Sequence, residues 1–307
     1  MGTNGTLICH IWAKLQIIWE GVLISLPTLV LSPGQSFSLD HSLGCGQVFR
    51  WEQTDDGWWY GVVGDKVIRI RQDGNRLTFE GSSKKFILDY FSLDLDLRPV
   101  IKSFDRDPFI HSAIEKCRGL RIIRQPKWEC LLSYTIATNS NIPTIKRRIA
   151  AIAETFGNEI LFEGRTFYSF PEPGLISCED ESALNCCKLG YRQPYVFRTA
   201  CKIPDREVWE RKVSSLPYEE ARKELMKCTG IGPKAADCIL LFAFEKYESF
   251  PVDVWIRRIM QEHYPVPADS GKPLTKKEYD AIRGFGLEYF GRYCGYAQEY
   301  LFAAREG

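Results

Sequence analysis

The chain has 307 residues, of which 45% are hydrophobic and 26% charged, so it can bury a sizeable core in one large or two moderate domains. The net charge of +1 excludes a strongly basic composition, although a basic face fits within a neutral total. Eleven cysteines, an odd number without CxxC pairs, favour reduced thiols in a cytoplasm over a disulfide framework or a zinc site.

Residues 1–31 differ in character from the rest of the chain. Leu15 to Leu31 is largely apolar, but it is short for a membrane span and is interrupted by a glutamine, a glutamate and a proline. The segment also lacks a clear cleavage site of small residues, which argues against a signal peptide. We expect a poorly ordered N-terminal extension over 1–31 with no membrane role. A truncated protein starting near Ser32 should then keep full activity.

From Phe37 to about Phe79 the sequence is typical of β-structure. β-branched and aromatic residues are concentrated in runs at 47–51, 58–63, 66–71 and 76–79. The turn signals Asp55-Asp56-Gly57, Gly64-Asp65 and Asp73-Gly74-Asn75 separate these runs at hairpin spacing. We expect three or four antiparallel strands, covered by helices around 86–91 and 107–117, in an α+β first domain over 32–110.

Beyond about residue 110 the pattern becomes helical. Residues at helical spacing form an apolar face: Trp128, Leu131, Leu132, Thr135 and Ile136. The helix that carries this face is predicted to end at the turn signals over 138–143. Asn139 lies in this turn, and a basic run over 146–148 follows, which is typical of a solvated face. Further on, Gly190 precedes Tyr191 and Arg192, and the simplest interpretation is a structural tyrosine beside a surface arginine. We expect a helical domain over 111–307.

A helix, a glycine turn and a second helix are predicted around Gly230 and Gly232. An apolar helical spacing ends before this turn, and Pro233 suits the first position of the next helix because its missing N–H costs nothing there. Backbone amides at such a helix start favour an anion, and a nucleic-acid phosphate is the natural candidate. Lys234 lies in the first turn, where the helix dipole disfavours its charge. We expect a lowered pKa and a nucleophilic amine there, although a plain turn with a solvated lysine gives the same pattern.

Asp253 precedes an apolar-periodic run, and its simplest interpretation is a helix N-cap. A carboxylate fixed at a helix start also suits the stabilisation of positive charge at a reacting carbon. Cys238 follows Lys234 by one helical turn, and Gln298 and Phe302 are likewise one turn apart on a C-terminal helix. For such pairs, a core residue beside a surface residue is the common explanation.

The glycine hairpin, Lys234 and the tripeptide Pro251-Val252-Asp253 together resemble the signature of the helix-hairpin-helix base-excision DNA glycosylases. The chain is most similar to their 8-oxoguanine DNA glycosylase branch, over residues 32 to 307. The resemblance implies an antiparallel sheet domain packed on a mainly helical glycosylase region. It also implies that Lys234 attacks C1′ of the damaged nucleotide and that Asp253 assists.

Further site residues follow from the resemblance alone. The carbonyl of Gly46 would accept a hydrogen bond from N7–H of the oxidised base, which guanine lacks. Phe302 and Cys238 would enclose the flipped base, and Gln298 would bind its Watson–Crick edge. The residues expected to contact DNA are Asn139, Tyr191, Arg192, Gly230 and Gly232.

Two positions depart from the family pattern. Thr144 stands where members with strict cytosine preference have a second arginine, so we expect weaker discrimination of the base opposite the lesion. Trp255 replaces a histidine found after the aspartate in some members. Neither change touches the lysine and aspartate on which the resemblance rests.

The function implied is a bifunctional DNA glycosylase and AP lyase that acts in base excision repair on double-stranded DNA containing 8-oxoguanine. We expect no cofactor and no iron–sulfur cluster, because only Cys294 follows Asp253, whereas related branches use four closely spaced cysteines there. We also expect a monomer in a prokaryotic-type cytoplasm, associated with the nucleoid. The alternatives are a helix-hairpin-helix glycosylase for alkylated or deaminated purines, and a non-catalytic DNA-binding module.

Overall fold

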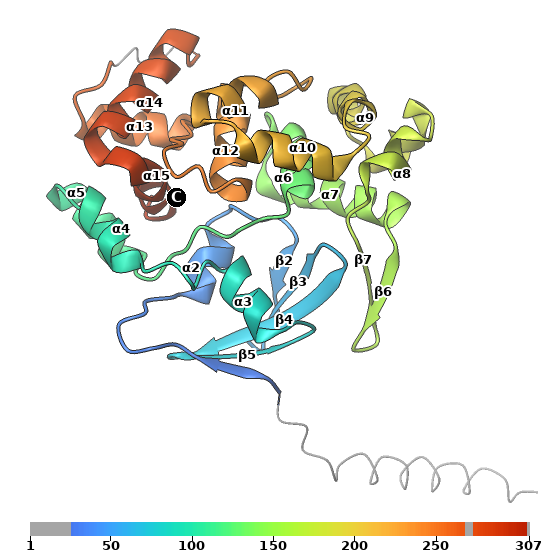
Figure 1. Cartoon of the computed structure of the whole chain (residues 1–307), viewed down its shortest axis with the longest axis horizontal. Coiled ribbons are helices and arrows are strands. Elements are labelled where there is room, and N and C mark those ends of the chain that lie inside the picture. Colours follow the sequence, from blue (N-terminus) through green and yellow to red (C-terminus); the bar gives the residue numbers. More distant parts are fainter. Residues whose placement is uncertain (1–25, 268–272, 306–307) are drawn as a thin grey trace, which may run out of the picture.

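The computed structural model describes residues 26–267 and 273–305. It has the predicted α+β architecture, with an antiparallel sheet at one end and a larger helical region at the other (Figure 1). Buried apolar residues form one cluster in the sheet and a second, larger cluster among the helices. Val100 and Phe104 belong to the helical cluster, although they precede residue 110 in the chain. No helix among the described residues is long and apolar enough to cross a membrane.

The sheet has five antiparallel strands in the order β1-β5-β4-β3-β2. Their bounds are β1 Thr28–Val30, β2 Trp51–Gln53, β3 Trp59–Val63, β4 Lys66–Asp73 and β5 Arg76–Glu80. Val63 pairs with Lys66 and Asp73 with Arg76, so two-residue turns join these hairpins as predicted. Gly64 and Gly74 supply the positive φ angles, 62° and 56°, that such turns require.

The strand predicted over 47–51 is wrong in position, because β2 begins only at Trp51. The Gln47 side chain explains the difference. Its amide donates to the carbonyls of Ser42 and Arg121, each at 2.8 Å, and accepts from the backbone N–H of Ile123 at 2.9 Å. A buried side chain therefore makes bonds that a neighbouring strand would otherwise make, and residues before Trp51 remain irregular.

The predicted N-terminal extension ends too late. Thr28–Val30 forms β1, which pairs with β5 through Thr28 and Thr78. Leu31 is 4% exposed and belongs to the sheet cluster. The sheet therefore has a fifth strand, β1, which the β-pattern of the sequence did not predict. Residues 1–25 of the predicted extension lie outside the described residues.

Short helices cover the sheet and connect it to the helical region. They are α2 Leu39–Gly44, α3 Lys84–Tyr90, α4 Leu97–Phe104 and α5 Pro108–Lys116. Each begins at a serine or aspartate whose side chain accepts a hydrogen bond from a first-turn amide: Ser38, Ser83, Asp96 and Asp107. Helices α3 and α5 therefore lie where helices were predicted, around 86–91 and 107–117. The prediction that both cover the sheet is wrong for α5, because its buried residues belong to the helical cluster and it packs against α15 Cys294–Ala303.

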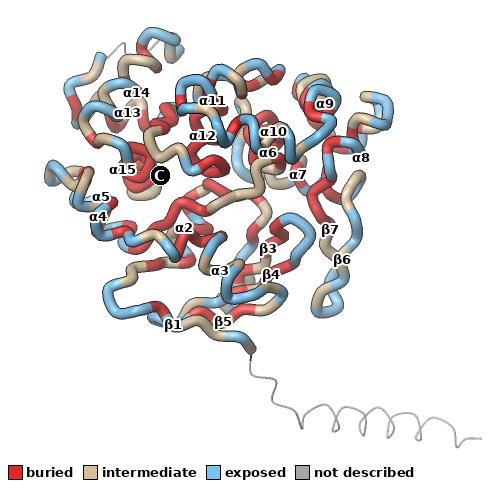
Figure 2. Tube along the Cα trace, in the orientation of Figure 1, coloured by how far each residue is buried: buried red, intermediate tan, exposed pale blue. Residues whose placement is uncertain are grey.

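The helical region begins with α6 Lys127–Ala137 and α7 Ile142–Phe156. It continues with α8 Pro173–Ser177, α9 Gln193–Lys202, α10 Arg206–Ser215, α11 Tyr218–Leu225, α12 Pro233–Ala243, α13 Val254–His263, α14 Lys276–Phe290 and α15 Cys294–Ala303. Three short 3-10 helices are η1 Glu181–Cys187, η2 Gly190–Arg192 and η3 Gly291–Tyr293. Buried residues run along α6, α12 and α15 (Figure 2). These three helices form the centre of the region.

A second hairpin, β6 Glu159–Phe162 and β7 Arg165–Tyr168, interrupts the helices and was not predicted. It runs alongside the sheet (Figure 1). The Tyr60 hydroxyl donates to Glu163 at 2.9 Å, and the Tyr60 and Phe167 rings stack with centroids 6.4 Å apart. The hairpin therefore ties the sheet to the helical region.

Candidate active site

The glycine turn lies between α11 and α12, as predicted. Gly230 has φ +87°, and a side-chain carbon added there would lie 2.5 Å from Cδ2 of Tyr195 on α9. Gly232 is the exposed N-cap of α12, and no side chain caps this helix start. Its first-turn amides are therefore available to an anion.

Lys234 is in the first turn of α12. Its side chain is accessible to solvent, although many protein atoms surround its ammonium group. The ammonium nitrogen lies 5.3 Å from the ring centroid of Tyr134, and Cys238, one turn further on, is within hydrogen-bonding reach. The ammonium group of Lys234 thus lies near the Tyr134 ring, and the lysine side chain remains accessible to a ligand.

The predicted lowering of the Lys234 pKa is wrong. Burial lowers the pKa, but Cys238, Asp253 and Glu299 raise it, and the net direction is upward from the ordinary value of a lysine. Burial raises the pKa of the Cys238 thiol to about 12, so this group is uncharged near neutral pH. Near neutral pH the negative charges that raise the pKa of Lys234 are therefore those of the Asp253 and Glu299 carboxylates.

Asp253 is the N-cap of α13, as predicted. Its Oδ1 accepts hydrogen bonds from the backbone amides of Trp255 at 3.0 Å and Ile256 at 2.9 Å. These bonds fix the carboxylate in direction. Its charge reaches both Lys234 and Cys238. The structure therefore places Asp253 close enough to Lys234 for its negative charge to raise the pKa of the lysine.

Gly46 lies between the side chains of Ile142 and Phe302. Its φ is +102°, and an added side-chain carbon would lie 3.4 Å from Cδ1 of Ile142 and 4.0 Å from Cε1 of Phe302. Only glycine adopts this conformation readily, and it brings the backbone close to the Phe302 ring. Gln298 is 5% exposed, and its Oε1 has no hydrogen-bond partner among the described residues. Such an unpaired buried acceptor is suited to an N–H donor of a ligand.

The structure brings together the three predicted DNA-contacting side chains outside the hairpin. Asn139 is exposed with φ 50°, and Tyr191 is 52% exposed. Arg192, however, is 4% exposed, which corrects the surface position first expected for it. Its guanidinium donates to the carbonyls of Thr138 and Asn139, the latter at 3.1 Å, and lies 4.2 Å from the Tyr191 ring centroid. In this structure the arginine joins the two loops to each other.

The comparisons with known proteins agree with this geometry. The family model described as 8-oxoguanine DNA glycosylase, N-terminal domain, matches residues 29–131. The Probable N-glycosylase/DNA lyase of Methanothermobacter thermautotrophicus is 31% identical, over 71% of this chain and 73% of its own length. The chain belongs to the 8-oxoguanine DNA glycosylase/lyase family.

Solved structures of the family match most of the chain. The 8-oxoguanine glycosylase/lyase of Clostridium acetobutylicum in its apo-form is 34% identical, with a TM-score of 0.81 over 88% of this chain and 93% of that one. The same enzyme in complex with double-stranded DNA containing cytosine opposite 8-oxoG is 32% identical, with a TM-score of 0.80 over 91% and 98%. The overall fold of this chain is therefore that of the family.

The two departures from the family pattern have defined surroundings. Arg147 donates to the Thr144 hydroxyl at 3.3 Å, so a guanidinium lies beside the residue that replaces an arginine. Trp255 packs with the Arg258 guanidinium 5.1 Å from its ring centroid. It also lines a cavity of about 600 Å³ with residues of α5, α13 and α15.

Three features of the site gave no sequence signal. Asp237 is fully buried, and its carboxylate accepts from the Tyr218 hydroxyl at 2.7 Å, from Arg222 at 2.9 Å and from Tyr279. The Arg305 guanidinium lies 3.7 Å from the Phe302 ring centroid. Glu299 is buried beside the predicted Gln298. A polar residue at a buried helical position is the only pattern that could have marked Asp237 and Glu299.

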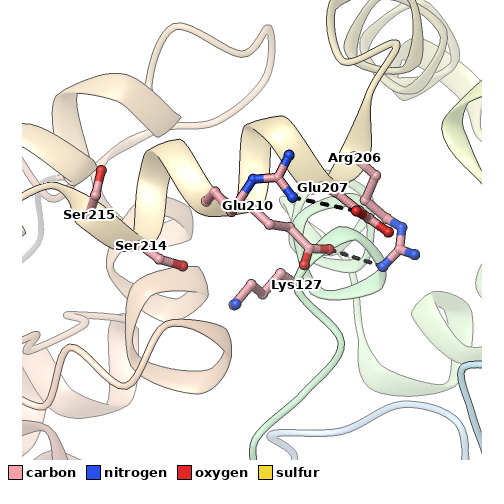
Figure 3. Close-up of a pocket in the computed structure, with 7 residues that line it drawn as sticks. Lys127, Arg206, Glu207, Glu210, Ser214 and Ser215 are labelled. Carbon is pink, nitrogen blue, oxygen red and sulfur yellow. Dashed lines mark hydrogen bonds and ion pairs between the residues drawn. The ribbon is translucent and has the colours of Figure 1, made fainter.

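A further cavity of about 590 Å³ lies along α10 and contains none of the predicted site residues (Figure 3). Its ion pairs join Arg206 to Glu210 at 3.2 Å and Arg211 to Glu207 at 3.4 Å. Because these charges neutralise one another, the cavity presents no net charge to a ligand from those four groups.

Proposed function

We propose that this protein excises 8-oxoguanine from double-stranded DNA and then cleaves the strand through a covalent intermediate on Lys234. The observation that carries the proposal is that Lys234 lies in the first turn of α12 and that Asp253, within its electrostatic reach, is the N-cap of the next helix, α13. Binding a phosphate would require neither group. Members of the same family are named as 8-oxoguanine glycosylase/lyases.

The chemistry follows from the charges of the two groups. The raised pKa of Lys234 means that the amine carries its proton at rest and must release it when the nucleotide enters. The neutral amine then attacks C1′, the bond to the base breaks, and Asp253 stabilises the positive charge on the sugar. The amine and C1′ form a Schiff base after the sugar ring opens. Loss of a C2′ proton then eliminates the 3′ phosphate and cleaves the strand.

The base pocket selects the oxidised purine by one donor. The Gly46 carbonyl accepts a hydrogen bond from N7–H, which guanine does not have. The free Oε1 of Gln298 accepts a second N–H from the Watson–Crick edge of the base. Phe302 and Cys238 contact the two faces of the ring. Flat apolar contacts with a single amide suit a neutral purine.

The loops on the DNA side hold the distorted duplex. Asn139 fills the gap left by the extruded nucleotide, Tyr191 wedges the base stack, and Arg192 contacts the unpaired cytosine after it releases the Asn139 turn. The amides around Gly230 and Gly232 bind a backbone phosphate.

Opposite-base preference should be moderate. One arginine contact supplies about 1–3 kcal/mol of discrimination, and Thr144 offers no second one. Excision opposite cytosine should therefore exceed excision opposite adenine by about 10- to 100-fold in single-turnover assays. Rates that differ by several orders of magnitude would contradict this expectation.

Three further predictions belong to this proposal. The protein is a monomer, it has no iron–sulfur cluster, and it is located in the cytoplasm. The sequence supports the absence of a cluster because Cys294 alone follows Asp253, and four thiolates hold such a cluster. The cysteines of the described residues are all free thiols, in keeping with a reducing compartment.

The proposal is tested by measuring base release and strand cleavage separately on three duplexes, which contain 8-oxoguanine, an alkylated purine or no lesion. We expect both products from the 8-oxoguanine duplex alone. Base release only from the alkylated purine would favour a different glycosylase specificity. Binding in a gel-shift assay without either product would favour a non-catalytic DNA-binding module, which is the second alternative.

A further inference from the structure

Arg148 of α7 bridges the two loops that are proposed to contact the distorted duplex. Its Nη1 donates to the Ser140 hydroxyl at 2.7 Å, and its Nε donates to the Lys188 carbonyl at 3.1 Å. Ser140 directly follows Asn139, which is proposed to fill the gap in the duplex, and Lys188 shortly precedes Tyr191, which is proposed to wedge the base stack. One rigid guanidinium therefore holds both loops on the same helix.

Each loop contains a backbone conformation that needs support. Asn139 has φ 50° and Lys188 has φ 52°, in the left-handed region that residues other than glycine rarely adopt. Such conformations persist where the surrounding structure fixes them. The two Arg148 bonds end on the residue after Asn139 and on Lys188 itself. Arg148 is therefore placed to stabilise both turns at once.

Arg192 makes a second connection between the same loops. Its guanidinium donates to the carbonyls of Thr138 at 2.9 Å and Asn139 at 3.1 Å. In the proposed function Arg192 gives up these bonds when it contacts the unpaired cytosine. The bonds of Arg148 end on the Ser140 hydroxyl and the Lys188 carbonyl, which no proposed DNA contact uses. Arg148 can therefore keep the loops in place while Arg192 changes partners.

We propose that Arg148 is a positioning residue that fixes the spacing between the Asn139 turn and the Tyr191–Arg192 segment when the protein engages a lesion. The proposal rests on the proposed function, since it concerns the same DNA-side loops. Arg148 acts through these loops and not through a phosphate contact of its own. Its loss should therefore weaken recognition of a gap in the base stack more than it weakens general attraction to DNA.

The first test measures amide hydrogen exchange in the free protein. The probes are the N–H groups of Ser140 and Lys188, each of which donates to a nearby backbone carbonyl. The control for Arg148→Gln is Arg147→Gln, which removes the same charge from an exposed position of α7 whose guanidinium donates to Thr144 of its own helix.

We expect both probes to exchange about tenfold faster in Arg148→Gln, the effect of losing roughly one hydrogen bond to a charged group at each loop. In Arg147→Gln they should exchange as in wild type. Unchanged exchange in Arg148→Gln would overturn the proposal, whatever the activity of the protein.

The second test compares binding to a duplex with a stable abasic-site analogue opposite cytosine and to an undamaged duplex. On the abasic-site duplex, Arg148→Gln should lose about tenfold in affinity beyond the loss seen in Arg147→Gln. On the undamaged duplex, the two variants should bind alike. An excess loss that is equal on both duplexes would indicate a phosphate contact and overturn the proposal.

A second variant separates geometry from charge. Arg148→Lys keeps the charge, but a single ammonium cannot reproduce the guanidinium fork that reaches both Ser140 and Lys188. It should therefore behave like Arg148→Gln in both tests, and full recovery of abasic-site binding by lysine would overturn the proposal. A wild type without preference for the abasic-site duplex would instead refute the proposed function, and the exchange measurement would still decide the role of Arg148.

Discussion

The two hairpin glycines, Gly230 and Gly232, should lose very different amounts of stability when each is replaced by alanine. At Gly230 an alanine would have φ +87°, which costs an L-residue about 1–2 kcal/mol. Its methyl carbon would also lie 2.5 Å from Cδ2, 2.9 Å from Cγ and 3.2 Å from Cβ of Tyr195. Because these atoms include the base of the side chain, a rotation of the ring tip alone cannot relieve the overlap. A clash of this kind typically costs a further 1–3 kcal/mol or so.

At Gly232 the same methyl group meets nothing within 4 Å, and φ is −92°. We therefore expect Gly230→Ala to lose about 2–5 kcal/mol of unfolding free energy, or roughly 4–10 °C in Tm, and Gly232→Ala to lose no more than about 1 kcal/mol. Gly232→Ala should instead weaken binding to lesion DNA, because the proposed function places a backbone phosphate at the amides around Gly232, where an added methyl group would crowd it. The assays are thermal melting and a binding isotherm for each variant. Equal Tm values for both variants would refute the steric reasoning.

Three further perturbations probe other parts of the account. Asp237→Ala should lower the unfolding free energy by about 3–5 kcal/mol in denaturant titration, because it leaves the buried Arg222 guanidinium with only its longer ion pair to Asp280, at 3.8 Å. Asp280→Ala, at a partly exposed position, should cost under about 1 kcal/mol. Phe302→Ala should slow excision of 8-oxoguanine about 10- to 100-fold through lost stacking, yet leave cleavage of a duplex with a preformed abasic site unchanged; equal losses in both assays would contradict a base-binding role. A protein starting at Ser32 lacks β1 and should melt at a lower temperature than one starting at Leu26; equal melting temperatures would make β1 dispensable.

Much of the fold was predictable because its signals are local. The two-residue turns at Gly64 and Gly74, the N-cap at Asp253 and the helix start at Pro233 each depend on residues a few positions apart. β1 was missed because its partner, β5, is distant in sequence and the strand has only three residues. The displaced start of β2 depends on long-range bonds of Gln47, which no local pattern shows.

The roles of the site residues stay predictions, and the electrostatics around Lys234 could not be predicted from the sequence. The pKa of Lys234 depends on Asp253 and Glu299, which the fold brings to it from other helices. The surface position expected for Arg192 failed for the same reason, since its partners are carbonyls of the Thr138–Asn139 turn, more than fifty residues earlier. Charge and burial are therefore properties of the assembled site and not of the motif.

The most direct test of the central claim is borohydride trapping on a duplex with one 8-oxoguanine opposite cytosine. It compares wild type with Lys234→Gln, and with Lys223→Gln on the exposed surface of α11 as the control. We predict a covalent protein–DNA adduct for wild type and Lys223→Gln, and none for Lys234→Gln. An adduct that persists in Lys234→Gln, or base release by the wild type without any adduct, would contradict the assignment of Lys234 as the nucleophile.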